Sequence, residues 1–272
     1  MSQQTLRSLV YYPNGPAGTE SDLAALAASP YFTNVVLGQF HFNEPDGHVT
    51  WNETILSDVP ANVWTAVKNL GQGKYPKIVS MQLGTAGNGT WKWIADNMDA
   101  AADTLIEIVK AKNGIVGIDL DPEPIGEVAL ETIYDFTLKL GSRKAKTPFY
   151  LSHVPVPFDD VYFPALYGTQ YWPQMAPFID WVTPQWYSTT GAKLVTAYEG
   201  FVAGLTTPSQ PLPPGIVVAG QESDSTSLGD LTSAITSLGK KYSSNWGGVG
   251  LWAYPLPSPD WAKSIYNALH GS

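Results

Sequence analysis

The stretch Gly114-Ile-Val-Gly-Ile-Asp-Leu-Asp-Pro-Glu123 is a short apolar segment that ends in three acids. Successive strand residues point to opposite faces, so the side chains of Asp119, Asp121 and Glu123 should share one face of a strand. Carboxyl groups this close together cannot all ionise at their ordinary pKa, and at least one should keep its proton near neutral pH. A protonated carboxyl at the end of a strand is what general-acid cleavage of a glycosidic bond requires.

Short apolar segments of this kind recur along the whole chain, with helical patterns between them. The predicted strands are residues 9–12, 34–40, 77–82, 114–121, 149–153, 181–187, 216–220 and 249–254. Continuous Val/Ile/Leu runs are typical of parallel strands buried on both faces. Eight strands alternating with helices favour a (β/α)8 barrel, an α/β fold, over a doubly wound open sheet, which usually has fewer strands.

The predicted helices follow from apolar residues at helical spacing and from terminal signals. They are residues 22–28, 60–70, 91–112, 128–140, 194–204, 228–238 and a last helix that starts after Ser258 and ends before Gly271. Residues 154–180 show no clear helix, and the Pro-rich segment 208–214 is only as long as a connector. We therefore expect residues 1–272 to form a single domain.

Composition excludes several classes of function. A net charge of −9 argues against nucleic acid as a partner, since phosphate binding needs a clustered basic surface. The chain has no cysteine and no metal-ligand spacing, so neither a metal nor another cofactor is expected. No apolar run is long enough to span a membrane. No signal peptide is visible at the start, which favours a cytoplasmic location or secretion without a visible signal, and we expect a monomer.

The acid-rich stretch resembles a motif of glycoside hydrolase family 18, which comprises chitinases and endo-β-N-acetylglucosaminidases. That family carries D-x-x-D-x-D-x-E on its fourth strand, and residues 116–123 fit it except that Val116 replaces the first Asp. Weaker matches lie on other predicted strands: Tyr11-Tyr-Pro-Asn on the first, Gln185-Trp-Tyr187 on the sixth and Trp252 on the eighth. The resemblance therefore extends over nearly the whole chain.

The resemblance implies a fold, a reaction and a set of roles. It implies a barrel without the insertion domain of processive chitinases and a retaining mechanism in which the substrate's own acetamido group attacks. Glu123 would protonate the leaving oxygen, Asp121 would orient the acetamido group, and Asp119 would bias Asp121 through a shared proton. Tyr187 would bind the acetamido oxygen, and Trp252 would stack under the sugar ring.

The implied substrate carries N-acetylglucosamine (GlcNAc), either as chitin oligomers or as the GlcNAc–GlcNAc core of an N-glycan. Further expected substrate contacts are polar or aromatic residues at strand ends, namely Tyr11, Phe40, Gln82, Gln185 and Trp186. Trp172 is a second candidate for a sugar platform. The histidines that end two strands, His41 and His153, could line the cleft or be hydrogen-bonded structural residues.

The chain departs from the family pattern at two places. Val116 removes an acid that we expect to lie deepest, so charge coupling among the remaining acids should be weaker. Ser80-Met-Gln-Leu lacks the family's Ser-x-Gly-Gly, and we expect Gln82 to point into the cleft instead. The connection after the seventh predicted strand has no room for a large insertion, which predicts a shallow, open cleft.

A non-catalytic carbohydrate-binding or inhibitory protein on the same barrel is the alternative. Val116 favours it, as does Pro122, whose fixed φ could re-aim the following acid. Retention of Glu123 argues against it, because such relatives usually lose this acid. Asn52-Glu-Thr and Asn88-Gly-Thr match the N-glycosylation pattern, which matters only for a secreted chain.

Overall fold

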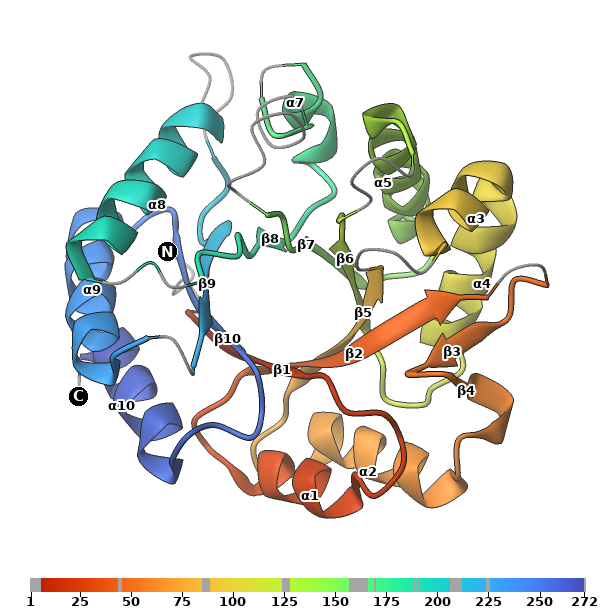
Figure 1. Ribbon diagram of the computed structural model, residues 1–272, viewed down its shortest axis with the longest axis horizontal. Helices are drawn as coiled ribbons and strands as arrows, with labels where there is room; N and C mark the ends of the chain where they lie inside the picture. Colours follow the sequence, from red (N-terminus) through yellow and green to blue (C-terminus); the bar gives the residue numbers. More distant parts are fainter. Residues whose placement is uncertain are drawn as a thin grey trace.

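Parallel strands close into a barrel in the part of the chain that the computed structural model describes (Figure 1). The described residues are 6–43, 46–84, 89–123, 128–156, 166–168, 170–187, 189, 191–205, 212–223 and 226–271. The eight barrel strands are β1 (Arg7–Tyr12), β2 (Asn34–Phe42), β5 (Ile78–Gly84), β6 (Gly117–Asp121), β7 (Tyr150–His153), β8 (Trp181–Val182), β9 (Val217–Glu222) and β10 (Trp246–Trp252). Parallel pairing of β1 with both β2 and β10 closes the ring. The predicted (β/α)8 barrel is confirmed.

Helices surround the barrel on the outside, as Figure 1 shows. They are α1 (Glu20–Ala28), α2 (Ala61–Gln72), α3 (Thr90–Asp96), α4 (Met98–Lys110), α5 (Leu130–Lys144), α7 (Trp172–Met175), α8 (Gly191–Leu205), α9 (Leu228–Lys241) and α10 (Pro259–His270), with the short 3-10 helix η1 (Leu56–Asp58). No helix among the described residues is long and apolar enough to cross a bilayer.

Two separate apolar clusters result from the alternation of strand side chains. The large one lies between the strands and the helices and includes Ile118 and Leu120 of β6. The smaller one fills the inside of the barrel and consists of Leu9, Tyr11, Val36, Val154, Trp181 and Val218. Because Ile118 and Leu120 face the helices, Asp119 and Asp121 must face the barrel interior.

The predicted helix over residues 91–112 is wrong in one respect, because it is two helices. Asn97 separates α3 from α4 with φ −136° and ψ 38°, and its side-chain Nδ2 donates to the carbonyl of Trp93 at 3.1 Å. Asparagine side chains compete in this way with the helical hydrogen bonds of the backbone. The apolar stripe itself was correctly assigned, since Ile94 and Leu105 on either side of the break are buried in the outer cluster.

Other predicted elements also differ at their ends. The sixth predicted strand, 181–187, is reduced to Trp181–Val182 with an isolated bridge from Gln185 to Gly220, because Pro184 has no N–H to donate to the ladder. A hairpin of β3 (Val49–Trp51) and β4 (Thr54–Ile55) extends β2 and was not predicted. Helix α5 continues through Gly141, where we expected it to stop. A Cβ at this position would come within 2.3 Å of the Phe178 ring, so the glycine lets that ring approach.

The connections agree with a barrel that lacks an inserted domain. Between β9 and β10 the described residues contain α9 alone. The side-chain amide of Asn52, in the first glycosylation pattern, is hydrogen-bonded within the fold: Nδ2 donates to the carbonyl of Pro13 and Oδ1 accepts from the N–H of Gln39, both at 2.5 Å. These contacts oppose attachment of a glycan at Asn52. Asn88 lies outside the described residues.

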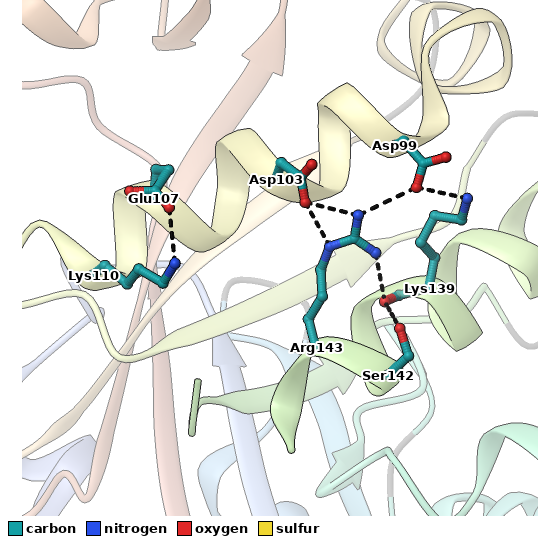
Figure 2. Close-up of polar contacts among 7 residues, drawn as sticks. All are labelled: Asp99, Asp103, Glu107, Lys110, Lys139, Ser142 and Arg143. Atoms are coloured by element: carbon teal, nitrogen blue, oxygen red, sulfur yellow. Dashed lines mark hydrogen bonds and ion pairs between the residues drawn. The ribbon is translucent and has the colours of Figure 1, made fainter. Parts of the chain in front are cut away.

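Ion pairs join the two helices that flank the acid-bearing strand β6. Figure 2 shows Arg143 of α5 reaching Asp103 and Asp99 of α4, with Nε to Asp103 Oδ1 at 2.8 Å, and Lys139 reaching Asp99 at 2.8 Å. Exposed pairs of this kind contribute little to stability individually. They do fix the register of α5, which follows β6, against α4, which precedes it.

Closure of the barrel depends on Gly248 of β10, which we expect to tolerate no side chain. Its φ is +118°, and a Cβ there would lie 1.9 Å from the carbonyl oxygen of Arg7 on β1. Gly248→Ala should lower the free energy of unfolding by about 3 kcal/mol through backbone strain and overpacking. Gly200→Ala in α8 is the matched control, because open space surrounds that position and alanine should stabilise the helix by about 0.5–1 kcal/mol. Urea unfolding of both variants measures the difference, and equal stabilities would contradict this account of closure.

Candidate active site

Three acids rise from the inside of the barrel to its carboxyl-terminal mouth, and we call them the acid row: Asp119, Asp121 and Glu123. Asp119 and Asp121 lie on β6 and are 0% and 4% exposed, whereas Glu123, two residues beyond, is only partly buried. The predicted common face is confirmed for the two strand residues. The row therefore presents one accessible carboxyl above two that are shielded from water.

Asp119 is the deepest acid of the row. The Ser152 hydroxyl on the neighbouring strand β7, its register partner, donates to Asp119 Oδ1. Burial raises the pKa of Asp119 to about 7, and the hydrogen bond from Ser152 lowers it in part. A carboxyl that holds its proton near neutral pH was predicted, but from like charges. The larger cause is desolvation, since the barrel interior disfavours the charged form.

Asp121 receives a side-chain amide on each of its two oxygens. Gln82 Nε2 of β5 donates to Oδ2 at 2.9 Å, and Gln185 Nε2 donates to Oδ1 at 3.2 Å. The Trp91 indole also donates to the backbone carbonyl of Asp121 at 3.3 Å. Burial raises the pKa of Asp121, the charges of Glu123 and Asp119 raise it further, and the Gln82 hydrogen bond lowers it.

Glu123 stands at the mouth of the barrel and is held by one amide. Gln185 Nε2 donates to Glu123 Oε1 at 2.7 Å, and the same nitrogen lies 3.1 Å from the carbonyl of Val154. Within the described ranges, the ion pairs include none to Glu123. Its carboxyl group is therefore oriented without being neutralised by a lysine or arginine.

Two further residues complete this side of the barrel. Tyr187 is partly exposed, and burial followed by the charges of Asp121 and Glu123 raises its pKa, so its hydroxyl remains a hydrogen-bond donor. The partly exposed Trp252 ring packs on the interior cluster, with its centre 5.6 Å from that of Tyr11. Aromatic side chains with one accessible face suit contacts with apolar surfaces of ligands.

Three aromatic residues that we expected to contact sugar are buried away from the acids, and those predictions are wrong. Phe40 is 0% exposed and stacks on Trp51 at 5.5 Å, because the pairing of β2 with β5 shifts register before it and turns its ring outward. Trp186 packs against Phe201 of α8 at 5.6 Å. Trp172 is likewise buried in the outer cluster. All three stabilise the layer between strands and helices.

Tyr11 and Gln82 reach the acids but not the surface, since each is 2% exposed. Their direct contact with substrate is therefore not supported. Gln82 donates to Asp121 instead, and Tyr11 packs in the interior cluster. Gln185, at 9% exposed, also binds two members of the row. Gln82 was expected to point into the cleft; its side chain does face the barrel interior, but it is buried there against Asp121.

The structure decides two other open points. His153 faces the helices, with Nδ1 2.8 Å from the Tyr167 hydroxyl and Nε2 3.1 Å from Thr137 Oγ1, so its role is structural; burial lowers its pKa to about 3. Val116 is 41% exposed and lies outside the row, on the opposite strand face from Asp119 by alternation. An acid at 116 would not lie beneath Asp119, so the expected weakening of charge coupling is wrong.

Ser152 and Trp91 are site residues that sequence reasoning missed. Ser152 follows Leu151 in a short buried strand, at the position level with Asp119, and a small polar residue there was the available signal. Trp91 carried no comparable signal, because its contact depends on how α3 packs.

No group of three or more His, Cys, Asp or Glu suited to a metal ion occurs in the described ranges. The shallow, open cleft stays a prediction, since residues 85–88 and 124–127, which follow β5 and β6 in the sequence, lie outside the described residues.

Comparison with known proteins identifies the fold. No family model and no curated protein matches the sequence. Among solved structures, the chain is similar to a GH18 chitinase from Pseudoalteromonas aurantia, with a TM-score of 0.72 and 19% identity over 96% of this chain and 99% of that one. It is also similar to the catalytic domain of a GH18 chitinase from the fern Peteris ryukyuensis, with a TM-score of 0.71 and 15% identity over 96% and 99% of the two chains.

A third similar structure is the chitinase ChiC from Aspergillus fumigatus, with a TM-score of 0.68 and 21% identity over 98% of this chain and all of that one. The chain thus has the barrel fold found in glycoside hydrolase family 18 chitinases, and the resemblance drawn from the acid-rich stretch is confirmed at the level of the fold. Identities this low establish shared architecture alone.

The raised pKa of Asp119 predicts an unusual pH dependence of stability. Because the folded value of about 7 exceeds the ordinary 3.8, the folded state holds an extra proton between these values, so stability should fall as pH rises from about 4 to 7. Asp119→Asn should remove this loss and be more stable than the wild type at pH 8 by on the order of 4 kcal/mol. Urea unfolding at several pH values measures it.

The two proteins should converge below about pH 3, where Asp119 is neutral in both the folded and the unfolded state. Asp135→Asn, an exposed acid on α5, is the control for a general charge effect. Parallel stability curves for the wild type and Asp119→Asn across the whole range would show that burial does not perturb Asp119.

Proposed function

We propose that this protein is a retaining glycosidase that hydrolyses β-1,4 bonds next to GlcNAc. The observation that carries the proposal is the position and exposure of the Glu123 carboxyl group. Its carboxyl is partly exposed at the mouth of the barrel, oriented by Gln185 at 2.7 Å and placed beside the buried Asp121. The similarity of the fold to solved chitinases supports the same class of substrate.

In the proposed reaction Glu123 gives its proton to the glycosidic oxygen as the bond to the anomeric carbon breaks. The oxygen of the substrate's own 2-acetamido group forms a new bond to that carbon, and the product is an oxazolinium ion. Asp121 accepts the acetamido N–H, which turns the oxygen toward the anomeric carbon and stabilises the positive charge. Water then attacks the same carbon, the bond from that carbon to the acetamido oxygen breaks, and a proton of the water passes to Glu123. Two displacements at one carbon retain its configuration.

The surrounding residues supply binding and orientation. The Tyr187 hydroxyl is proposed to donate to the acetamido oxygen, and the accessible face of Trp252 to stack under the sugar ring. Chitin oligomers and the GlcNAc–GlcNAc core of an N-glycan both provide the acetamido group that this mechanism needs. We propose a monomer as the acting unit, because every group used here comes from one chain.

Glu123→Gln should separate the enzyme from a non-catalytic sugar-binding protein. The amide cannot donate a carboxyl proton, so turnover should fall about 10²–10⁴-fold while binding of GlcNAc oligomers persists. Product masses from chitin oligomers and from a high-mannose glycoprotein, each treated with wild type and variant, give turnover and identify the substrate. Binding without hydrolysis of either substrate by the wild type would favour the non-catalytic alternative.

Trp252→Ala should weaken substrate binding because it removes the proposed platform. We expect KM to rise about tenfold, corresponding to a stacking contact of about 1–1.5 kcal/mol. Trp186→Phe is the control, since its ring is buried against α8: it should reduce stability and leave KM unchanged. A KM for Trp252→Ala equal to that of the wild type would remove Trp252 from the proposed binding site.

A further inference from the structure

Gln82 reaches past its own neighbour to contact Asp121. In the parallel pairing of β5 with β6, Gln82 is level with Asp119 and Gly84 is level with Asp121. Its Nε2 nevertheless donates to Asp121 Oδ2 at 2.9 Å. The side chain therefore leans toward the mouth of the barrel and contacts the middle member of the acid row, not the deepest.

The two amides hold Asp121 from opposite sides. Gln82 comes from β5 on one side of β6, and Gln185, which donates to Oδ1, comes from the segment after β8 on the other. A donor on each oxygen restricts rotation of the carboxyl group, and each oxygen keeps a second lone pair that can accept a further hydrogen bond. Hydrogen bonds of this kind favour the carboxylate over the neutral acid.

We propose that Gln82 is a positioning residue that keeps Asp121 oriented and able to accept a hydrogen bond from the substrate. This inference rests on the proposed function, in which Asp121 accepts the acetamido N–H. A glycine stands at this position in the Ser-x-Gly-Gly pattern with which residues 80–83 were compared, so the contact belongs to this chain's own sequence.

Gly38 of β2 provides the space that Gln82 occupies. A Cβ on Gly38 would lie 2.6 Å from Gln82 Oε1, whereas the next nearest atoms would be 3.8 Å away. Gly38 is not among the described glycines with positive φ, so no left-handed backbone conformation opposes alanine at this position. Gly38→Ala should therefore act through Gln82, because that side chain is the one neighbour that must move.

Removal of the Gln82 donor should change the pH profile in a definite direction. Several titratable groups interact with Asp121: Asp119 and Glu123 of the acid row, Tyr11 of β1, Tyr167 before α7 and Tyr187 after β8. All of these are acids or phenols, so Gln82 and Gln185 supply the hydrogen bonds that favour the carboxylate. Loss of one donor raises the pKa of Asp121, and the acidic limb of the rate profile should move to higher pH.

The test compares the pH dependence of kcat and kcat/KM on a chitin oligomer for the wild type and three variants. Gln82→Met keeps the approximate side-chain volume and removes the donor: kcat should fall about tenfold, and the acidic limb should move up by about one pH unit. Gly38→Ala should reproduce both changes, and the double variant should show no further shift. Gln221→Met is the control. It also removes a buried amide, but this amide donates to the backbone carbonyls of Trp186 and Gly220, so the acidic limb of the rate profile should stay at the wild-type pH.

The outcomes separate this inference from the proposed function. Suppose that the wild type hydrolyses the oligomer and that Gln82→Met or Gly38→Ala is folded but has the acidic limb of its rate profile at the wild-type pH. This result would overturn the role of Gln82 and leave the glycosidase proposal intact. The same shift in Gln221→Met would assign the effect to general loosening and also overturn it. A wild type without hydrolytic activity would instead defeat the proposed function, and this inference with it.

Discussion

The burial of two carboxyl groups inside a closed barrel is the constraint on which this site depends. Asp119 and Asp121 are almost wholly removed from water, and transfer of a charged group into such surroundings is strongly unfavourable unless hydrogen bonds or a counter-charge compensate. In the described part of the chain no cation pairs with them. Neutral donors surround them instead: a hydroxyl on Asp119 and two amides on Asp121.

Neutral donors and a counter-ion have different consequences for chemistry. An arginine or lysine would hold the acids permanently ionised, whereas hydroxyl and amide donors leave their protonation responsive to pH. The solvent exposure of the three acids increases toward the mouth of the barrel, from the buried Asp119 to the partly exposed Glu123. The proposed reaction uses this order, with Glu123 as the proton donor at the accessible end and Asp121 as the hydrogen-bond acceptor just below it.

Aromatic residues on the outer and inner sides of the barrel strands have different roles. Phe40, Trp172 and Trp186 pack between strands and helices, whereas Trp252 lies against the interior cluster and keeps one part accessible. The same residue type serves both purposes because a large ring stabilises any apolar layer that it fills. Position relative to the wall, and not residue identity, decides which tryptophan is available to a ligand.

The sequence by itself determined the barrel and the direction of its central acids. Strand alternation is a local property of the chain, so the common interior face of Asp119 and Asp121 followed from spacing alone, as did the succession of eight strands. Gln82 was likewise expected to point inward. These features need only the period of each element and the order in which the elements occur.

Only the tertiary structure decided what each inward residue touches. Gln82 contacts Asp121 and not its register partner Asp119, and Gly38 leaves the space that the Gln82 side chain occupies. The shifted register before Phe40, the contact of Trp91 with Asp121 and the exposed position of Val116 depend in the same way on packing between distant segments. Local periodicity carries no information about such contacts, because they are set by the relative placement of elements that are far apart in the sequence.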